Sequence, residues 1–353
     1  MNVSVRSYPL LLLAVAGVIA SLTTAQQSLA QTSVATNPVG YIQETLTPSP
    51  NGTRTYSTVS FPLHQTPVFV GLVASVSGDT ITLSGSIPSG LTASPYMVHI
   101  ESSSNAIATG QSFLITAAGT NYVTVSSPTF TVQSILTTND QVAIRGAETL
   151  GSVFGSTNST VLLQGGSGVS GADVVKLWNG STYLTFYYYT STGWVSATDP
   201  SYTPVDNTVI YPDEGVMVGR ISTNTLPATY AMSMGTVATN AQTALVNVPG
   251  YSFVSNPLPT AVSLSQFGFT NSPSWLEGES SSSADLVKIW NGTAWQNYYY
   301  YTNYGWVLDT DQNYTLQNNT TIPPGSAVMV LRQNADSVTP VNAYIPVALN
   351  YTP

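Results

Sequence analysis

Apolar and polar residues alternate in short runs along most of this chain, which is the period of a β-strand. Residues 174–178, with the sequence Val-Val-Lys-Leu-Trp, are mostly β-branched or aromatic, and Asn179-Gly180 follows with the residue types of a type I′ turn. A two-residue loop here would place Lys176 opposite Tyr183 on the returning strand. Because no window shows the 3.6-residue period of an amphipathic helix, the pattern predicts an all-β protein.

The chain contains an internal duplication. Residues 173–220 match residues 285–332 without a gap, and 25 of these 48 positions are identical. Upstream, residues 56–63 match residues 251–258, with six of eight positions identical. The offset is 112 residues for the first match and 195 for the second, so the first copy is 83 residues longer than the second and carries an insert. A repeat longer than about 100 residues indicates duplicated domains rather than a solenoid.

The expected fold is all-β, with two related antiparallel β-sandwich-like halves and a small inserted β-barrel or sandwich. The insert itself shows several short strand patterns separated by turn residues such as Ser77-Gly78-Asp79. The predicted organisation is a signal peptide over residues 1–30, a first β repeat over residues 31–67 and 148–236, an inserted domain over residues 68–147, and a second β repeat over residues 237–353.

The N-terminal residues have the pattern of a secretory signal peptide. Arg6 precedes an apolar stretch over residues 9–20, and small residues then offer cleavage after Ala25 or Ala30. No other segment reaches the roughly 18 apolar residues that a membrane-spanning helix requires. The sequence therefore predicts an exported protein, extracellular, at the cell surface or in the periplasm, without a transmembrane segment in the mature chain.

Three motifs together carry a resemblance to a known family. The sequence Val-Ala-Thr-Asn-Pro-Val-Gly-Tyr occupies residues 34–41, directly after the predicted signal peptide. The block Ala-Asp-x-Val-Lys-x-Trp-Asn-Gly occurs at residues 172–180 and 284–292, and each copy leads into Tyr-Tyr-Tyr-Thr, Gly-Trp-Val and Val-Met-Val-x-Arg. This arrangement resembles a family of exported bacterial β-proteins. The resemblance implies export from a Gram-negative-type cell and brings no activity, cofactor or catalytic residue with it.

The composition excludes several classes of function. Charged residues make up only 7% of the chain, its net charge is −9, and seven Lys and Arg residues cannot build a nucleic-acid-binding surface. The chain has no cysteine, so disulfides, thiolate metal sites and cysteine nucleophiles are excluded. No motif for a cofactor is present, and none is predicted.

The charged residues favour structural roles over catalysis. The two histidines, His64 and His99, lack the surrounding motif of a catalytic triad, and His99 is interpreted as an ordinary strand residue. Asp173 and Asp285 occupy equivalent positions in the two copies. Because an active site is seldom repeated in the same strand context, we expect them to cap a turn or to pair with arginines, namely Arg220 and Arg332.

The remaining acids suggest two weaker alternatives. A secreted hydrolase would use Glu277, Glu279, Asp309 and Asp311, although no motif supports it. Asp309 and Asp311 also offer oxygen ligands at alternating positions for a Ca²⁺ ion, but the segment lacks the glycine and the distal glutamate of an EF-hand loop. The sequence therefore predicts no catalytic residue and no metal site.

The aromatic residues are the remaining candidates for a binding site. Side chains alternate along a strand, so each run of tyrosines places rings on both faces. One face must pack in the core, and the other either is buried in a two-layer sandwich or faces solvent. The residues of this hypothetical aromatic surface are Trp178, Tyr187, Tyr189, Trp194, Trp290, Tyr299, Tyr301 and Trp306.

Three functions remain open at this point. The leading hypothesis is a non-enzymatic extracellular or cell-surface structural or interaction protein, such as an adhesive, matrix or appendage component, that self-associates through strand addition. The alternative is a protein that binds extracellular polysaccharide through the aromatic surface. The third is the secreted hydrolase.

Overall fold

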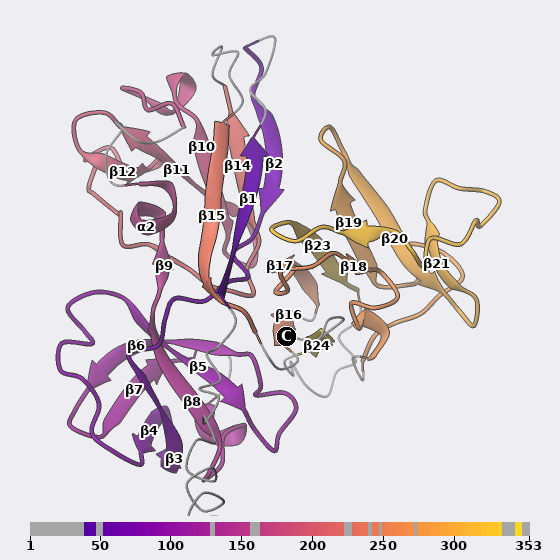
Figure 1. Cartoon of the computed structure of the whole chain (residues 1–353). Coiled ribbons are helices and arrows are strands. Elements are labelled where there is room, and N and C mark those ends of the chain that lie inside the picture. Colours follow the sequence, from indigo (N-terminus) through magenta and orange to yellow (C-terminus); the bar gives the residue numbers. More distant parts are fainter. Residues whose placement is uncertain are drawn as a thin grey trace, which may run out of the picture. The chain divides into compact units, whose positions relative to one another are not determined.

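The computed structural model describes residues 39–46, 52–127, 131–155, 163–221, 228–238, 242–246, 249–271, 274–333 and 343–347. The predicted signal peptide lies outside these residues. The regular structure is almost entirely antiparallel β-sheet (Figure 1), which confirms the predicted all-β class with two related halves and a small barrel. In the part of the chain that the structure describes, no helix combines the length and apolarity needed to cross a membrane.

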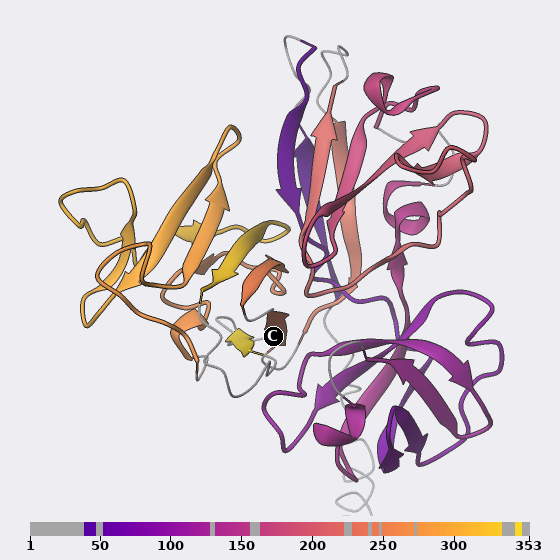
Figure 2. The ribbon, with the colours of Figure 1, turned by 180° about the vertical axis from the view of Figure 1, so that it is seen from behind.

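The first half is built on a five-stranded antiparallel sheet in the order β12-β11-β10-β14-β2. These strands are β2 (Thr55–Val59), β10 (Val174–Trp178), β11 (Tyr183–Tyr189), β12 (Gly193–Ser196) and β14 (Val216–Arg220). Two further strand pairs complete it, β1 (Val39–Leu46) with β15 (Ala228–Thr236) and β9 (Glu148–Thr149) with β13 (Val209–Ile210), together with the single-turn helices α2 (Leu150–Phe154) and η3 (Val169–Gly171). β1 and β15 lie side by side in both views (Figure 2).

The second half repeats this arrangement. Its five-stranded sheet has the order β21-β20-β19-β23-β17, which corresponds strand for strand to the first sheet. The strands are β17 (Gly250–Ser255), β19 (Leu286–Trp290), β20 (Trp295–Tyr301), β21 (Gly305–Leu308) and β23 (Ala327–Arg332). The accompanying pairs are β16 (Gln242–Val246) with β24 (Ala343–Val347) and β18 (Val262–Ser263) with β22 (Thr321–Ile322), and η4 (Phe269–Asn271) is a single turn.

The residues that fill the two sandwich cores also correspond. Trp194 and Trp306 are 0% and 1% exposed and occupy equivalent places beside Phe154 and Phe269. One face of β11 and of β20 packs into these cores, because Tyr188 and its equivalent Tyr300 each form an edge-on contact with the core tryptophan. The two copies that are similar in sequence therefore also pack their cores in similar ways.

The hairpin prediction is wrong in its register. Trp178 lies opposite Tyr183 and Lys176 opposite Thr185, because the loop is two residues longer than a type I′ turn. Asn179 accepts hydrogen bonds at its side-chain oxygen from the amides of Ser181 and Thr182, at 3.0 and 2.8 Å. This side-chain cap competes with the tight two-residue turn that the Asn-Gly pair predicts.

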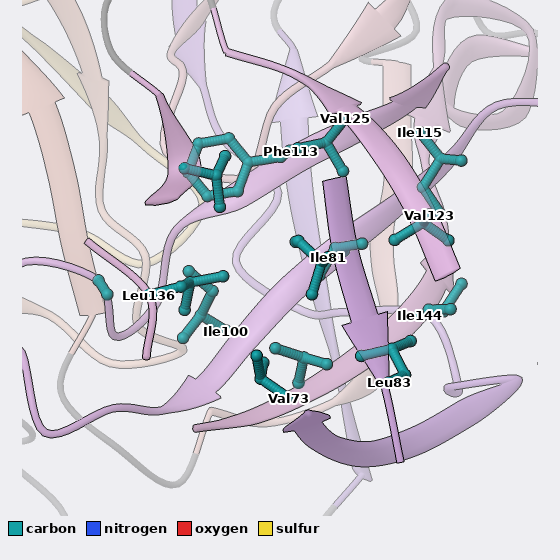
Figure 3. Close-up of a cluster of buried hydrophobic side chains, with 14 of the residues drawn as sticks. Val73, Ile81, Leu83, Ile100, Phe113, Ile115, Val123, Val125, Leu136 and Ile144 are labelled. Atoms are coloured by element: carbon teal, nitrogen blue, oxygen red, sulfur yellow. The ribbon is translucent and has the colours of Figure 1, made fainter. Parts of the chain in front are cut away.

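The insert forms a closed six-stranded barrel in the order β3-β4-β7-β6-β5-β8. Its strands are β3 (Phe69–Ser77), β4 (Thr80–Leu83), β5 (Tyr96–Ser102), β6 (Ser112–Ala118), β7 (Tyr122–Ser126) and β8 (Gln141–Gly146), with the short helix η2 (Val132–Ser134) between the last two. Alternate residues of each strand point inward and fill the barrel with branched aliphatic side chains (Figure 3). Closure removes the open sheet edges that such a weakly charged chain would otherwise expose.

The two halves contact each other through reciprocal hydrogen bonds. The indole of Trp178 donates to the carbonyl of Tyr251 at 3.0 Å, and the indole of Trp290 donates to the carbonyl of Tyr56 at 2.8 Å. An apolar cluster that includes the equivalent residues Met217 and Met329 lies at the same contact. The backbones approach closely here. A Cβ added to Gly215 would lie 2.5 Å from the Cβ of Ala327, which explains the glycine.

Candidate functional site

The face of each five-stranded sheet that points away from the sandwich core carries a cluster of tyrosines. In the first half, Tyr187 is 3% exposed and forms the base of the cluster, and Tyr189 packs edge-on against it at 6.4 Å between ring centroids. Tyr202, from the loop after β12, stacks on Tyr189 with centroids 4.6 Å apart and an angle of 13° between the rings. We call these three residues the first tyrosine platform.

The second tyrosine platform consists of Tyr299, Tyr301, Tyr304 and Tyr314. Tyr299 is its 3% exposed base, and Tyr301 lies 6.5 Å from it. Tyr314 packs edge-on against Tyr301 at 5.2 Å, and Tyr304, which replaces Thr192 of the first copy, does so at 6.1 Å. The outermost rings of both platforms face solvent, since Tyr202, Tyr304 and Tyr314 are 40%, 51% and 43% exposed.

The loop that presents Tyr202 and Tyr314 has the same backbone in both copies. Each tyrosine has a left-handed conformation, with φ of +53° and +54°. The first loop is held by Asp199, whose two carboxylate oxygens accept from the amides of Ser201 and Thr203 at 2.8 and 2.9 Å. These hydrogen bonds favour the charged form and lower the pKa of Asp199.

Asp311 holds the second loop in the same way. Its oxygens accept from the amides of Asn313 and Thr315, each at 2.9 Å. A hydrogen bond from the side chain of Thr315 and then the amide of Asn313 are the main causes that lower its pKa. Both oxygens of Asp311 therefore serve the turn, as those of Asp199 do.

Four of the eight aromatic residues predicted for a surface are buried instead. Trp194 and Trp306 lie in the sandwich cores, and Trp194 also donates to the carbonyl of Gly155 at 2.7 Å. Tyr187 and Tyr299 are covered by the outer rings of their own platforms. This corrects the expected surface, because these rings are needed to fill the space on each side of the sheet and cannot face a ligand.

The other four predicted residues divide into two pairs. Trp178 and Trp290 are half-buried at the contact between the halves, where their indole nitrogens are hydrogen-bonded to the opposite half. Tyr189 and Tyr301 are half-buried beneath the outer rings of the platforms. Only this second pair contributes to an aromatic surface.

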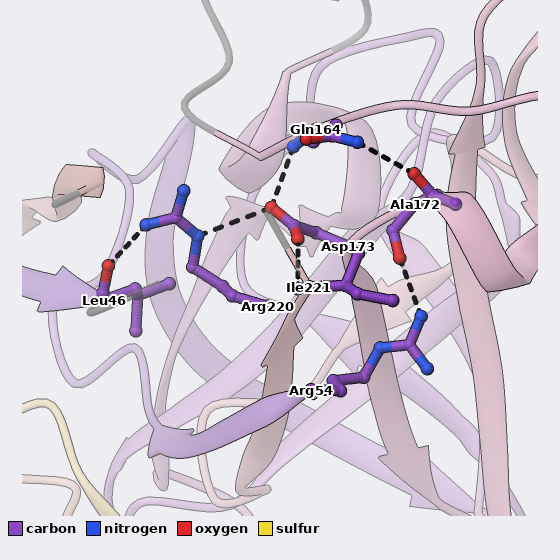
Figure 4. Close-up of polar contacts among 8 residues, drawn as sticks. Leu46, Arg54, Gln164, Ala172, Asp173, Arg220 and Ile221 are labelled. Atoms are coloured by element: carbon purple, nitrogen blue, oxygen red, sulfur yellow. Dashed lines mark hydrogen bonds and ion pairs between the residues drawn. The ribbon is translucent and has the colours of Figure 1, made fainter. Parts of the chain in front are cut away.

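The equivalent aspartates form buried ion pairs with the equivalent arginines, as one of the two predicted roles requires. Figure 4 shows the pair of the first half, Asp173 with Arg220. Asp173 accepts from Nε of Arg220 at 3.4 Å and from the amides of Gln164 and Ile221. Asp285 makes the same set of contacts, with Nε of Arg332 at 2.6 Å. All four charged side chains are at most 3% exposed, so these contacts hold each half together.

Three of the four acids considered for a hydrolase are exposed, and Asp311 is half-buried. Glu277, Glu279 and Asp309 are exposed, and the amide of Asn297 approaches Asp309 at 3.5 Å. Among the described residues, no group of three or more His, Asp or Glu side chains is arranged to hold a metal ion.

The two histidines meet at a buried junction between the barrel and the first half. His64 and His99 lie 4.3 Å apart between ring centroids, and Nδ1 of His99 is 2.9 Å from the hydroxyl of Ser112. Arg145 contacts Glu101 and donates to the carbonyl of Gln65 and the hydroxyl of Thr236. Burial, reinforced by Arg145, lowers the pKa of His99 to about 3 and that of His64 well below its usual value.

A small cavity lies at this junction. The cavity lined by His64, His99, Ser112 and Arg145 has a volume of about 20 Å³. That volume accommodates about one water molecule.

The half-buried carboxyl groups of Asp213 and Glu214 were not anticipated. Burial, reinforced by the neighbouring Asp213, raises the pKa of Glu214 to about 8. Asp213 also accepts from the amide of Leu245 at 3.5 Å, and the amide of Ser255 donates to its carbonyl. The second copy has Gly325-Ser326 at these positions, so this carboxylate pair belongs to the first copy alone.

Sequence reasoning missed the exposed rings of the platforms, Tyr202, Tyr304 and Tyr314. For two of them a signal was present, because Thr-Asp-x-x-Tyr-Thr recurs at residues 198–203 and 310–315. The chain matches no protein-family model, no curated protein and no solved structure. The family resemblance therefore stays a prediction, and the geometry of the site is the basis for a function.

Proposed function

We propose that this chain is an exported, non-enzymatic interaction protein of the cell surface or extracellular matrix, and that the two tyrosine platforms are its contact sites. The observation that carries this proposal is the left-handed backbone of Tyr202 and Tyr314. A left-handed residue other than glycine costs roughly 1–2 kcal/mol, and asparagine or glycine is the usual choice there. Two equivalent loops that both present a tyrosine in this conformation indicate selection for the ring.

The charge distribution supports a contact made by rings and hydroxyl groups. Tyrosine supplies a large, rigid apolar face with a polar tip and is enriched at binding surfaces. With only 7% charged residues, the chain has little electrostatic attraction to offer a partner. Binding through the platforms is therefore expected to change little with salt concentration.

The test compares adhesion of matched tyrosine variants. Purified mature protein is sedimented with cells of the producing strain and with their extruded matrix. Tyr202→Asn combined with Tyr314→Asn removes the two left-handed rings and leaves Tyr304 in place. Asparagine suits the left-handed backbone, so adhesion should fall and folding should persist. Tyr122→Asn is the matched control, because Tyr122 is 42% exposed but lies on the barrel. Wild-type protein that fails to sediment, or a double variant that sediments as well as wild type, contradicts the proposal.

The proposed compartment has its own measurement. Fractionation of the producing cells should find the protein outside the cytoplasm, and N-terminal sequencing should begin after Ala25 or Ala30. An N-terminus at Met1 in the cytoplasmic fraction would contradict export.

Self-association by strand addition is the second route to an adhesive role. The outer edge of β12 is covered by the amide of Val205, which donates to the carbonyl of Trp194, and β21 is covered in the same way by Gln317. The edges β2 and β17 receive the indole hydrogen bonds of the opposite half. A partner strand would have to displace these contacts. A concentration-dependent rise in mass by light scattering would nevertheless identify self-association.

A further inference from the structure

We propose that each tyrosine platform is a subsite for one ring of a neutral polysaccharide. This inference rests on the proposed function and names the class of its ligand. The outermost rings, Tyr202 in the first platform and Tyr304 and Tyr314 in the second, are the surfaces on which the sugar stacks.

The geometry of the first platform leaves one aromatic face free. Tyr202 lies nearly parallel to Tyr189, with 13° between the rings, so the inner face of Tyr202 is covered. Its 40% exposure then belongs largely to its outer face and edge. A pyranose ring presents a flat face of C–H groups with slight positive charge, and this face is attracted to the negative face of an aromatic ring.

The residues next to each outer ring provide hydrogen-bonding partners for sugar hydroxyls. Tyr202 is flanked by Ser201 and Thr203, and all three are exposed. Tyr314 is flanked by the exposed Asn313 and Thr315. An apolar face bordered by hydroxyl and amide groups is the chemistry that a sugar recognises, because a sugar carries both kinds of surface.

The distribution of charge selects neutral over acidic polymers. Every described Lys and Arg is engaged elsewhere: Arg145, Arg220 and Arg332 in ion pairs, Arg54 with the carbonyls of Val169 and Ala172, and Lys176 and Lys288 over the rings of Tyr56 and Tyr251. The charges nearest the platforms in the chain are instead the carboxylates of Asp199, Asp309 and Asp311. Uronate, sulfate or phosphate groups would meet like charge there.

The two platforms are not identical, and the difference predicts how much affinity each retains when one ring is removed. Tyr304 adds a third outer ring to the second platform, where the first copy has Thr192. Removal of Tyr314 should therefore leave more residual affinity in its platform than removal of Tyr202 leaves in the first. A polymer that reaches both platforms gains affinity from their linkage, which a monosaccharide cannot.

The experiment titrates the purified mature protein with defined polymers by calorimetry and affinity gel electrophoresis. The neutral probes are a soluble β-glucan, a mannan and a galactan, and the acidic probes are alginate and polygalacturonate. At least one neutral polymer should bind, and the acidic polymers should not. The Tyr202→Asn and Tyr314→Asn double variant should lose affinity by roughly tenfold or more, while Tyr202→Phe and the Tyr122→Asn control should not.

Three results would overturn the inference: no neutral polymer binds, an acidic polymer binds at least as tightly, or the folded double variant binds like wild type. The sedimentation assay separates this failure from failure of the proposed function. Protein that still adheres to matrix through the platforms but ignores all neutral polymers has the proposed function and a different ligand. Protein that does not adhere at all lacks the proposed function.

Discussion

The buried and exposed sides of the duplicated sheet differ in how closely the two copies agree. The Asp173–Arg220 and Asp285–Arg332 contacts repeat donor for donor, down to the two backbone amides that each carboxylate accepts. The tyrosine platforms keep their loops but differ in the number and angle of their outer rings. A buried charge needs every partner in place, whereas an exposed ring tolerates a change of neighbour.

The largest expected effect comes from the buried ion pairs. Asp285→Asn leaves the guanidinium of Arg332 buried without its counter-charge, and the cost should be about 3–5 kcal/mol in urea unfolding. Asp173→Asn should cost the same within about 1 kcal/mol if the two pairs are equivalent. The double variant Asp285→Leu with Arg332→Met removes both charges and should cost less than Asp285→Asn. A single variant that proves milder than the double variant would refute this account.

The unduplicated histidine junction should respond to acid. The folded pKa of His99 is about 3, below its unfolded value near 6.5, so the unfolded state binds more protons between these limits. Stability present above pH 6.5 is therefore lost as the pH falls, by roughly 2–3 kcal/mol at pH 4.5 for His99 alone.

The difference between wild type and His99→Asn measures this contribution together with any change in His64, because the charge of His99 also lowers the pKa of His64. Glu214, with its raised pKa, acts in the opposite direction and stabilises the fold as the pH falls below about 8. Its contribution is common to both proteins and cancels in their difference. Parallel losses of stability in the two proteins between pH 7 and pH 4.5 would show that His99 does not titrate in this way.

The contact between the halves should show a smaller, reciprocal effect. Trp178→Phe removes the hydrogen bond to the carbonyl of Tyr251, and Trp290→Phe removes its counterpart to Tyr56. Each should cost about 1 kcal/mol of unfolding free energy. Because both bonds act at one contact, the double variant should depart from additivity. Strict additivity in a double-mutant cycle would indicate two independent contacts.

The smallest effect is expected at the platforms. Tyr202→Asn relieves left-handed strain but loses the stack on Tyr189, and these contributions are of similar size, so stability should change by less than about 1 kcal/mol. Tyr314→Asn loses an edge-on contact instead and should behave alike. Thermal unfolding of both variants measures this change in stability. A loss of several kcal/mol would mean that the rings hold the loops, and that their exposure serves stability rather than binding.

The two copies also show how much of the site could be predicted from the sequence. Equivalent acids and arginines at a constant offset limited Asp173 and Asp285 to two roles, capping a turn or pairing with an arginine, and the structure shows the pairs. The same reasoning failed for Trp194 and Trp306. An aromatic residue that fills a core and one that contacts a ligand both recur at equivalent positions of a duplicated sequence. Only the packing in the folded protein distinguishes the two roles.

The sequence by itself determined the β character of the chain, its duplication and the presence of an insert, because strand periodicity and repeated identity are properties of residue order. Tertiary structure alone decided the hairpin register, the meeting of His64 with His99, and which tyrosines face solvent. These features depend on where a side chain finds its neighbours from distant strands. Asp199 and Asp311 hold equivalent loops through their carboxylates. Each loop presents a left-handed tyrosine, and the two copies together form an exposed, repeated surface.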